Sequence, residues 1–159
     1  AELGAAASLL DDLTLFGSYS FNRSTYEDDV VNAAGVVIAP IKGKTVVDTP
    51  RHMAKLELSY DPASGPFGRI GASHQSKRFF TFTNDQSVSG RTLVDATLGW
   101  RFGGEGLLGG LAVQASVTNL LDKEYVATIG SNGFGNRGDN QTLLAGAPRQ
   151  WFLTVRKDF

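Results

Sequence analysis

The 159-residue chain contains no cysteine, only two histidines and no long apolar run. Without cysteine, disulfide frameworks, cysteine-rich zinc sites and thiol nucleophiles are excluded. The longest apolar run, residues 36–39, ends at Pro40 and is far shorter than the roughly 18 residues that a membrane helix requires. The first residues, AELGAAASLLDD, lack the positive region of a secretory signal. Any association with a membrane must therefore depend on strands.

The chain also has little charge of either sign. Charged residues make up 19% of it, below the roughly 25% that is usual for soluble domains, and the net charge is −1, so no nucleic-acid partner is expected. His52 and His74 are not spaced as metal ligands. The G-x-G-x-x-G match at 133–138 has no helix after it, and no Ser-His-Asp arrangement has a suitable turn. We therefore predict no catalytic residue, no cofactor and no metal.

The last eleven residues, RQWFLTVRKDF, alternate between apolar and polar positions. Trp151, Leu153, Val155 and Phe159 fall on one side together with Lys157, and the other side is polar except for Phe152. A period of two is typical of a strand with one face in an apolar medium and one in water. A large terminal aromatic ring also indicates an anchored chain end, for example at a membrane interface.

The same alternation recurs along the chain, at residues 13–22, 54–60, 69–77, 94–102 and 111–118. Residues 1–8 fit either another strand or the start of a helix. Short connections at about 9–12, 61–66 and 103–110 alternate with long ones at about 27–51, 81–90 and 126–147. This asymmetry is typical of outer-membrane barrels. The sequence therefore predicts an all-β fold: an antiparallel up-and-down meander of about six to seven strands, part of a transmembrane β-barrel.

The aromatic and charged residues predict which way each face points. Two aromatic belts are expected, at the short-turn end (Tyr60, Phe67, Trp100, Phe102, Phe159) and at the long-loop end (Tyr26, Phe79, Phe80, Tyr125). Turning a basic residue of the polar rows to lipid would cost roughly 2–4 kcal/mol near the midplane, and an acidic residue somewhat less. The polar rows are therefore expected to line the lumen, with Lys55, Glu57, Asp95, Arg101 and Arg156.

Two motifs near the carboxyl terminus have local physical roles. Asn119 and Asp122 of the stretch NLLDKEY suit a bend where a strand leaves the membrane, because their side chains bond nearby backbone. Tyr125 can anchor at the interface with its ring in lipid, and Pro148, which lacks an N–H donor, suits the first residue of a strand. With Phe159, these motifs resemble the carboxyl-terminal end of a TonB-dependent outer-membrane receptor. The residues that carry the resemblance are Asn119, Leu120, Asp122, Lys123, Tyr125, Pro148 and Arg149.

The resemblance implies a place in the bacterial outer membrane and TonB-dependent uptake of a nutrient such as a ferric siderophore. Residues 1–159 would be the carboxyl-terminal segment of the barrel, without the plug domain and the earlier strands. Expected partners are outer-membrane lipid, the barrel-assembly machinery, the remainder of the receptor and, through the plug alone, TonB. The insertion signal would be carried by Trp151, Leu153, Val155 and Phe159. The expected ligand-contacting loop residues are Tyr26, Arg78, Asn132, Phe134, Arg137 and Asn140.

Two other functions fit the same alternation. A small autonomous barrel of about eight strands could serve as an adhesin or membrane anchor, with its interior filled by side chains. A soluble β-barrel carrier would instead turn its apolar side inward around an apolar ligand. Partitioning between water and detergent separates the soluble carrier from both membrane proteins.

Overall fold

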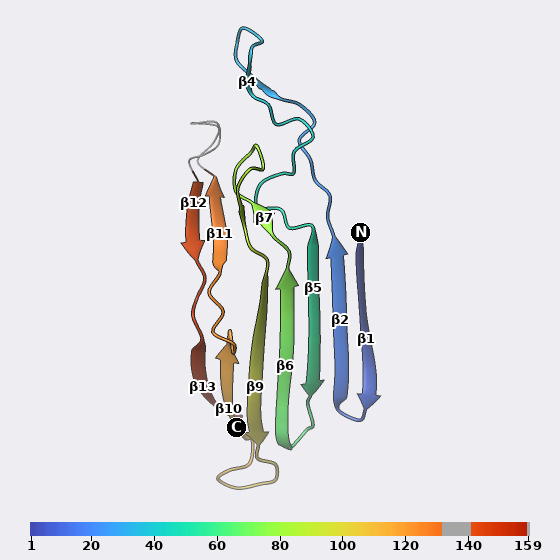
Figure 1. Cartoon of the computed structure of the whole chain (residues 1–159). Coiled ribbons are helices and arrows are strands. Elements are labelled where there is room, and N and C mark those ends of the chain that lie inside the picture. Colours follow the sequence, from blue (N-terminus) through green and yellow to red (C-terminus); the bar gives the residue numbers. More distant parts are fainter. Residues whose placement is uncertain (132–140, 159) are drawn as a thin grey trace.

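The computed structural model describes residues 1–131 and 141–158, and these residues form one large antiparallel sheet (Figure 1). The sheet order is β1-β2-β5-β6-β9-β10-β13, so each inner strand pairs with the long strands before and after it. The strands are β1 (Glu2–Leu10), β2 (Leu13–Phe21), β5 (His52–Tyr60), β6 (Gly65–Gln75), β9 (Arg91–Arg101), β10 (Leu111–Thr118) and β13 (Gln150–Lys157). The predicted meander of about six to seven strands is confirmed with seven, and the first residues form a strand rather than a helix.

The predicted difference between the two ends of the sheet is also present. Short turns join the strands at the lower end of Figure 1, while the long connections stand at the upper end and hold three small hairpins. These are β3 (Val30–Val31) with β4 (Val37–Ala39), β7 (Arg78–Phe79) with β8 (Ser87–Val88), and β11 (Val126–Ser131) with β12 (Gln141–Ala145). The shortest turn, Asp11–Asp12, places Asp12 at φ +61°, a left-handed conformation that aspartate tolerates. No helix long and apolar enough to span a bilayer occurs among the described residues.

The register of the strands gives the sheet one apolar face and one polar face. Leu58 lies opposite Leu15 on one neighbour and Ile70 on the other. On the other face, Lys55 lies between Ser18 and Ser73. Because side chains alternate with a period of two, this register keeps each row on the same side across the sheet.

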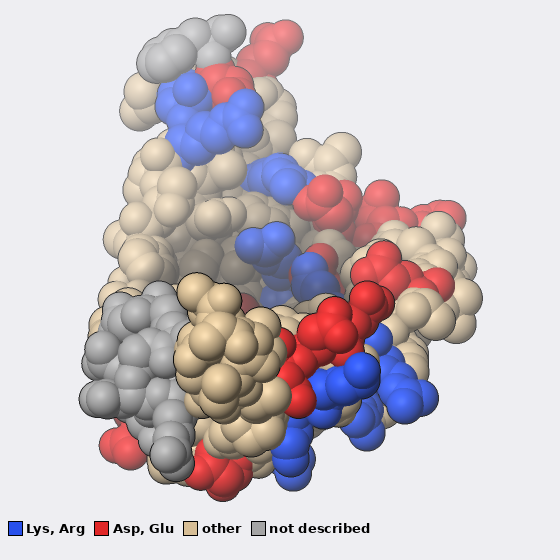
Figure 2. All heavy atoms as spheres, turned by 90° about the horizontal axis from the view of Figure 1, so that it is seen from above, with Lys and Arg blue, Asp and Glu red and all other residues tan. Residues whose placement is uncertain are grey.

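The apolar face, called the outward face below, is largely uncovered. Leu98 is 71% exposed and Leu153 is 74% exposed, and both lie in the middle of long strands. A soluble monomer rarely leaves so continuous an apolar surface in water. The opposite face forms the hollow side of the curved sheet, where basic and acidic side chains gather (Figure 2). An apolar exterior and a charged concave interior are the arrangement of a membrane barrel wall rather than of a soluble carrier.

The buried core of the described residues lies among the long connections, beyond the ends of the strands. Ala39, Ile41 and Phe82 are almost fully buried against one another, and Tyr26, Val30 and Val47 pack around them. These residues come from the connections 22–51 and 76–90. We call these two connections, together with the stems of the third (119–131 and 141–149), the loop layer.

Candidate functional site: the polar wall and the loop layer

The polar wall consists of the inward-facing residues of the seven long strands. Lys55 Nζ lies 3.1 Å from Glu57 Oε2, and Asp95 Oδ1 accepts the backbone N–H of Asn119 at 2.8 Å. Arg69, between Ser59 and Thr97 in the register, forms no ion pair with any described residue. The wall therefore carries side chains of both charge signs along one face, and the exposed Arg69 guanidinium has no ion-pair partner there among the described residues.

At the short-turn end of the wall, Arg101 fixes the connection between β5 and β6. Its guanidinium donates to Asp61 and to the carbonyl of Pro62, both at 2.6 Å, and lies 4.3 Å from the centroid of the Phe67 ring. The ring also covers the Cα of Gly99, where any Cβ would clash with it. Phe67 therefore faces the lumen, and its expected place in an outward aromatic belt is wrong. Phe67 lies two residues before Arg69 on β6, so the alternation in the sequence already placed the two side chains on the same, polar face.

The first and second long connections are locked together by Asn84. Its side-chain oxygen accepts the N–H of Thr45 at 2.6 Å, and its side-chain nitrogen donates to the carbonyl of Thr45 at 2.9 Å. The amide thus pairs with a backbone unit as a neighbouring strand would. Asn84 adopts φ +61°, and Phe82, two residues earlier, is inserted into the core beside Ile41. The two connections therefore form one packed body.

Arg78 joins all three parts of the loop layer. It is 4% exposed, its Nη1 lies 2.5 Å from Asp48 Oδ1, and its Nη2 donates to the carbonyl of Val126 at 2.6 Å. Arg91 donates to the same carbonyl at 3.1 Å. Two guanidiniums therefore converge on one oxygen with one carboxylate beside them. Because Arg78 is enclosed by protein partners, its side chain is not available to a ligand here, contrary to the sequence-based expectation.

The structure also places Tyr26, another predicted ligand contact, and Tyr125, the predicted interfacial anchor. Tyr26 packs beside Phe82, with ring centroids 6.0 Å apart, and is half-buried as part of the loop core rather than presented to a ligand. The Tyr125 ring lies 4.4 Å from the Arg91 guanidinium and against Gly146. Since Arg91 occupies a polar-wall position on β9, the Tyr125 ring lies on the lumen side, and the expected lipid-facing anchor is wrong. The other candidates, Asn132, Phe134, Arg137 and Asn140, lie outside the described residues.

The NLLDKEY stretch makes the bend that the sequence predicted. Asn119 is buried at φ +50°; its side-chain oxygen accepts the N–H of Lys123, and its side-chain nitrogen donates to the carbonyls of Lys123 and Ala147. Asp122, at φ +51°, accepts the N–H of Arg149 at 2.9 Å. These contacts connect the end of β10 to the entry of β13. The two motifs that stand far apart in the sequence therefore form one structural unit.

The last strand presents its expected row outward. Trp151, Leu153 and Val155 lie opposite Val117, Ala115 and Val113 of β10, and all three are exposed. Pro148 lies two residues before β13 begins at Gln150, and Phe159 lies outside the described residues. β13 and β1 are the two edges of the described sheet.

Comparison with known proteins gives consistent matches. A family model described as "TonB dependent receptor-like, beta-barrel" matches residues 1–120. The ferrichrome outer membrane transporter/phage receptor of Escherichia coli K12 is 29% identical over 131 residues, which are 80% of this chain and 16% of the relative. The ferrioxamine B receptor of Salmonella typhimurium SL1344 is 29% identical over 147 residues, 90% of this chain and 20% of the relative.

A solved structure shows the same fold. The ferric yersiniabactin uptake receptor of Yersinia pestis superposes with a TM-score of 0.75 at 18% identity, over 99% of this chain and 23% of that one. This chain spans about a fifth of the length of the curated relatives that it matches.

Proposed function

This chain belongs to the TonB-dependent receptor β-barrel family, and we propose that it forms the carboxyl-terminal part of a receptor for ferric siderophore uptake. Its place is the outer membrane of a Gram-negative bacterium. Relatives that match most of its length are named for ferrichrome and for ferrioxamine B. The role that this kinship supports is transport rather than catalysis.

The observation that carries the proposal is the continuous polar wall beneath a packed loop layer. Apart from Lys157 at the end of β13, the charged side chains of the seven long strands share the inward face, and that face ends at the loop layer. A hydrophilic solute crossing a barrel needs such a wall, whereas lipid needs only the opposite face. The small autonomous barrel and the soluble carrier are not favoured, because β1 and β13 remain unpaired edges among the described residues and the apolar face is the outer one.

Within this segment we assign the roles as follows. Lys55, Glu57 and Arg69 on the wall would meet the plug and the water-filled path, and TonB would act through the plug. Candidate ligand contacts are the third-connection residues, because Arg78 and Tyr26 are engaged in packing. The outward residues of β13 would carry the signal read by the barrel-assembly machinery. The proposed insertion residues are Trp151, Leu153, Val155 and Phe159, and the proposed ligand contacts are Asn132, Phe134, Arg137 and Asn140.

The test is iron uptake in the host of the receptor that contains this segment. Deleting the receptor should abolish uptake of radioactive iron from at least one of ferrichrome, ferrioxamine B and ferric pyoverdine, for which receptors similar to this chain are named. The full-length receptor should restore that uptake in energised cells and fail to do so after the proton gradient is dissipated. Unchanged uptake from all three complexes in the deletion strain would refute the proposal.

A further inference from the structure

The outward face contains a groove near its loop end, with a volume of about 450 Å³. Its floor is made of small residues on three neighbouring strands, Gly17, Ala54 and Ala72, and Leu3 and Leu56 form its sides. A Cβ added to Gly17 would already touch Leu56 Cδ1 at 3.7 Å, so the depression exists because these residues are small. Its volume falls within the roughly 300–1,000 Å³ typical of ligand pockets.

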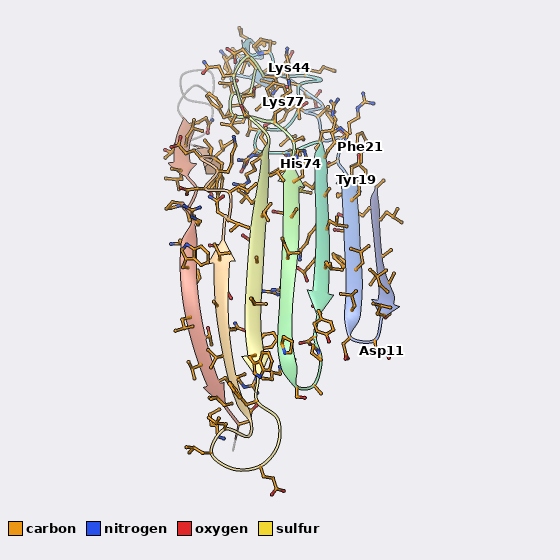
Figure 3. The ribbon with its side chains drawn as sticks, turned by 60° about the horizontal axis from the view of Figure 1, so that its bottom comes forward. Asp11, Tyr19, Phe21, Lys44, His74 and Lys77 are labelled. Carbon is orange, nitrogen blue, oxygen red and sulfur yellow. The ribbon has the colours of Figure 1, made fainter. Side chains whose placement is uncertain are left out.

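The loop end of this groove is polar. His74 Nδ1 lies 2.9 Å from Thr92 Oγ1, and both residues line the groove together with Tyr19. Tyr19 Oη lies 2.7 Å from Nδ1 of His52 on the adjacent strand. Figure 3 shows Tyr19, Phe21 and His74 together near the loop end of their strands. The outward rows of β1, β2, β5, β6 and β9 hold no charged residue, so these hydroxyl and imidazole groups are the polar end of an otherwise apolar surface.

When the neighbouring hydroxyls donate to Nδ1, these hydrogen bonds leave Nε2 of each imidazole as a donor for an acceptor outside the protein. When the Thr92 hydroxyl donates to Nδ1 of His74, the neutral ring carries its hydrogen on Nε2. His74 is exposed, and Nε2 has no partner among the described residues. The pair of His52 and Tyr19 has the same arrangement one strand away. In this tautomer His74 presents an N–H donor at the loop end of the groove, and His52, which does not line the groove, presents one on the neighbouring strand.

We propose that this groove binds one phosphorylated acyl-chain lipid. The acyl chain lies over Gly17, Ala54 and Ala72, and a headgroup phosphate oxygen accepts the Nε2–H of His74. The groove is continuous with the face that contacts lipid, so its occupant must be apolar along the strands. The polar groups stand at one end alone, so the occupant must also carry acceptor oxygens at one end. Phosphate is such an acceptor, and a hydrogen bond to an ionised acceptor is stronger than one between neutral groups.

Native mass spectrometry of the full-length receptor that contains this segment, in detergent, tests the acyl-chain site. Added phosphatidylglycerol should be retained by the wild-type receptor. The variant Ala72→Leu should lower the retained fraction by about threefold or more, because the larger side chain fills the floor of the groove. The matched control is Ala115→Leu, an outward alanine on β10 that is exposed where Ala72 is half-buried, and that lies outside the groove. Circular dichroism and heat-modifiable migration establish that both variants fold.

The headgroup contact is tested separately with diacylglycerol of the same chains. His74→Ala should lower retention of phosphatidylglycerol and leave that of diacylglycerol unchanged, whereas Ala72→Leu should lower both. Inorganic phosphate should not displace the lipid. Equal retention by the Ala72→Leu and Ala115→Leu variants, an unchanged lipid preference in His74→Ala, or a receptor dimer in place of the lipid adduct would overturn the proposal. No siderophore enters this assay, so its failure leaves the uptake proposal untouched.

Discussion

Replacing Arg78 with methionine removes the charge that joins the three parts of the loop layer while keeping an apolar side chain of similar length. The substitution leaves Asp48 without its ion pair and the Val126 carbonyl with Arg91 as its remaining guanidinium donor. Breaking a buried ion pair typically costs about 3–5 kcal/mol. Asp48 is 36% exposed, and water can solvate it in the variant, so we expect a loss of about 2 kcal/mol in the local free energy of opening.

Hydrogen exchange in the full-length receptor measures this loss. The amide of Asp48, which donates to the Phe79 carbonyl at 3.0 Å, reports on the first connection, and the amides of β11 report on the third. Both sets should exchange roughly 30-fold faster in the Arg78→Met variant. Arg149→Met is the control, because Arg149 is 44% exposed and lies 4.0 Å from Asp122.

The pattern of exchange decides between a joint and a local role for Arg78. If β11 keeps its protection while Asp48 loses it, Arg78 stabilises its own connection alone. If neither changes, the buried contact contributes nothing measurable and the reasoning is refuted. A double-mutant cycle with Asp48→Asn separates the ion pair from the contacts of Arg78 with the carbonyls of Val126 (2.6 Å) and Ala127 (3.4 Å), because the asparagine removes the charge alone.

Three further outcomes are expected. Asn119→Ala should destabilise the barrel by about 1–3 kcal/mol, measured by urea titration of the receptor in lipid vesicles, since two part-buried carbonyls and one N–H lose the buried Asn119 side chain as their partner; a change below about 0.5 kcal/mol would contradict this. In the same assay, Leu98→Arg should cost about 2–4 kcal/mol and the neighbouring Thr97→Arg much less, and equal costs would mean that the faces are wrongly assigned. Hydrogen bonds from the Thr81 and Thr83 hydroxyls lower the pKa of Asp85. The Gln86 amide, which donates to Thr81, should therefore be fully protected from hydrogen exchange above the ordinary aspartate range and lose that protection as the pH falls through the lowered pKa. Asp85→Asn should abolish this pH dependence of exchange.

The long strands could be predicted from sequence because their signal is local. A period of two in polarity fixes which residues share a face, and the register then carries that assignment across neighbours. The same rule would have placed Phe67 correctly, since its parity is that of Arg69. The error came from assigning aromatics to a belt by their position along the chain instead of by their parity.

The loop layer could not be predicted in the same way. The contacts of Arg78 and Asn84 join residues about 30 to 50 positions apart, and no periodicity marks them. The hairpins β3–β4 and β7–β8 have strands of two or three residues, too short to show alternation. Asn119 and Asp122 were found because both residue types bond nearby backbone and tolerate a positive φ, which is again a local property.

The buried core lies among the long connections because the strands are surrounded by lipid and the connections by water. Along the strands, lipid accepts the apolar row directly, so Leu98 and Leu153 need no protein cover. Beyond the strands the chain meets water, where apolar side chains must bury one another. Phe82 and Ile41 do so, and Asn84 and Arg78 supply the polar ties that hold the packed connections together. The loop layer is therefore expected to move as one body, and any motion that admits a ligand must arise outside it.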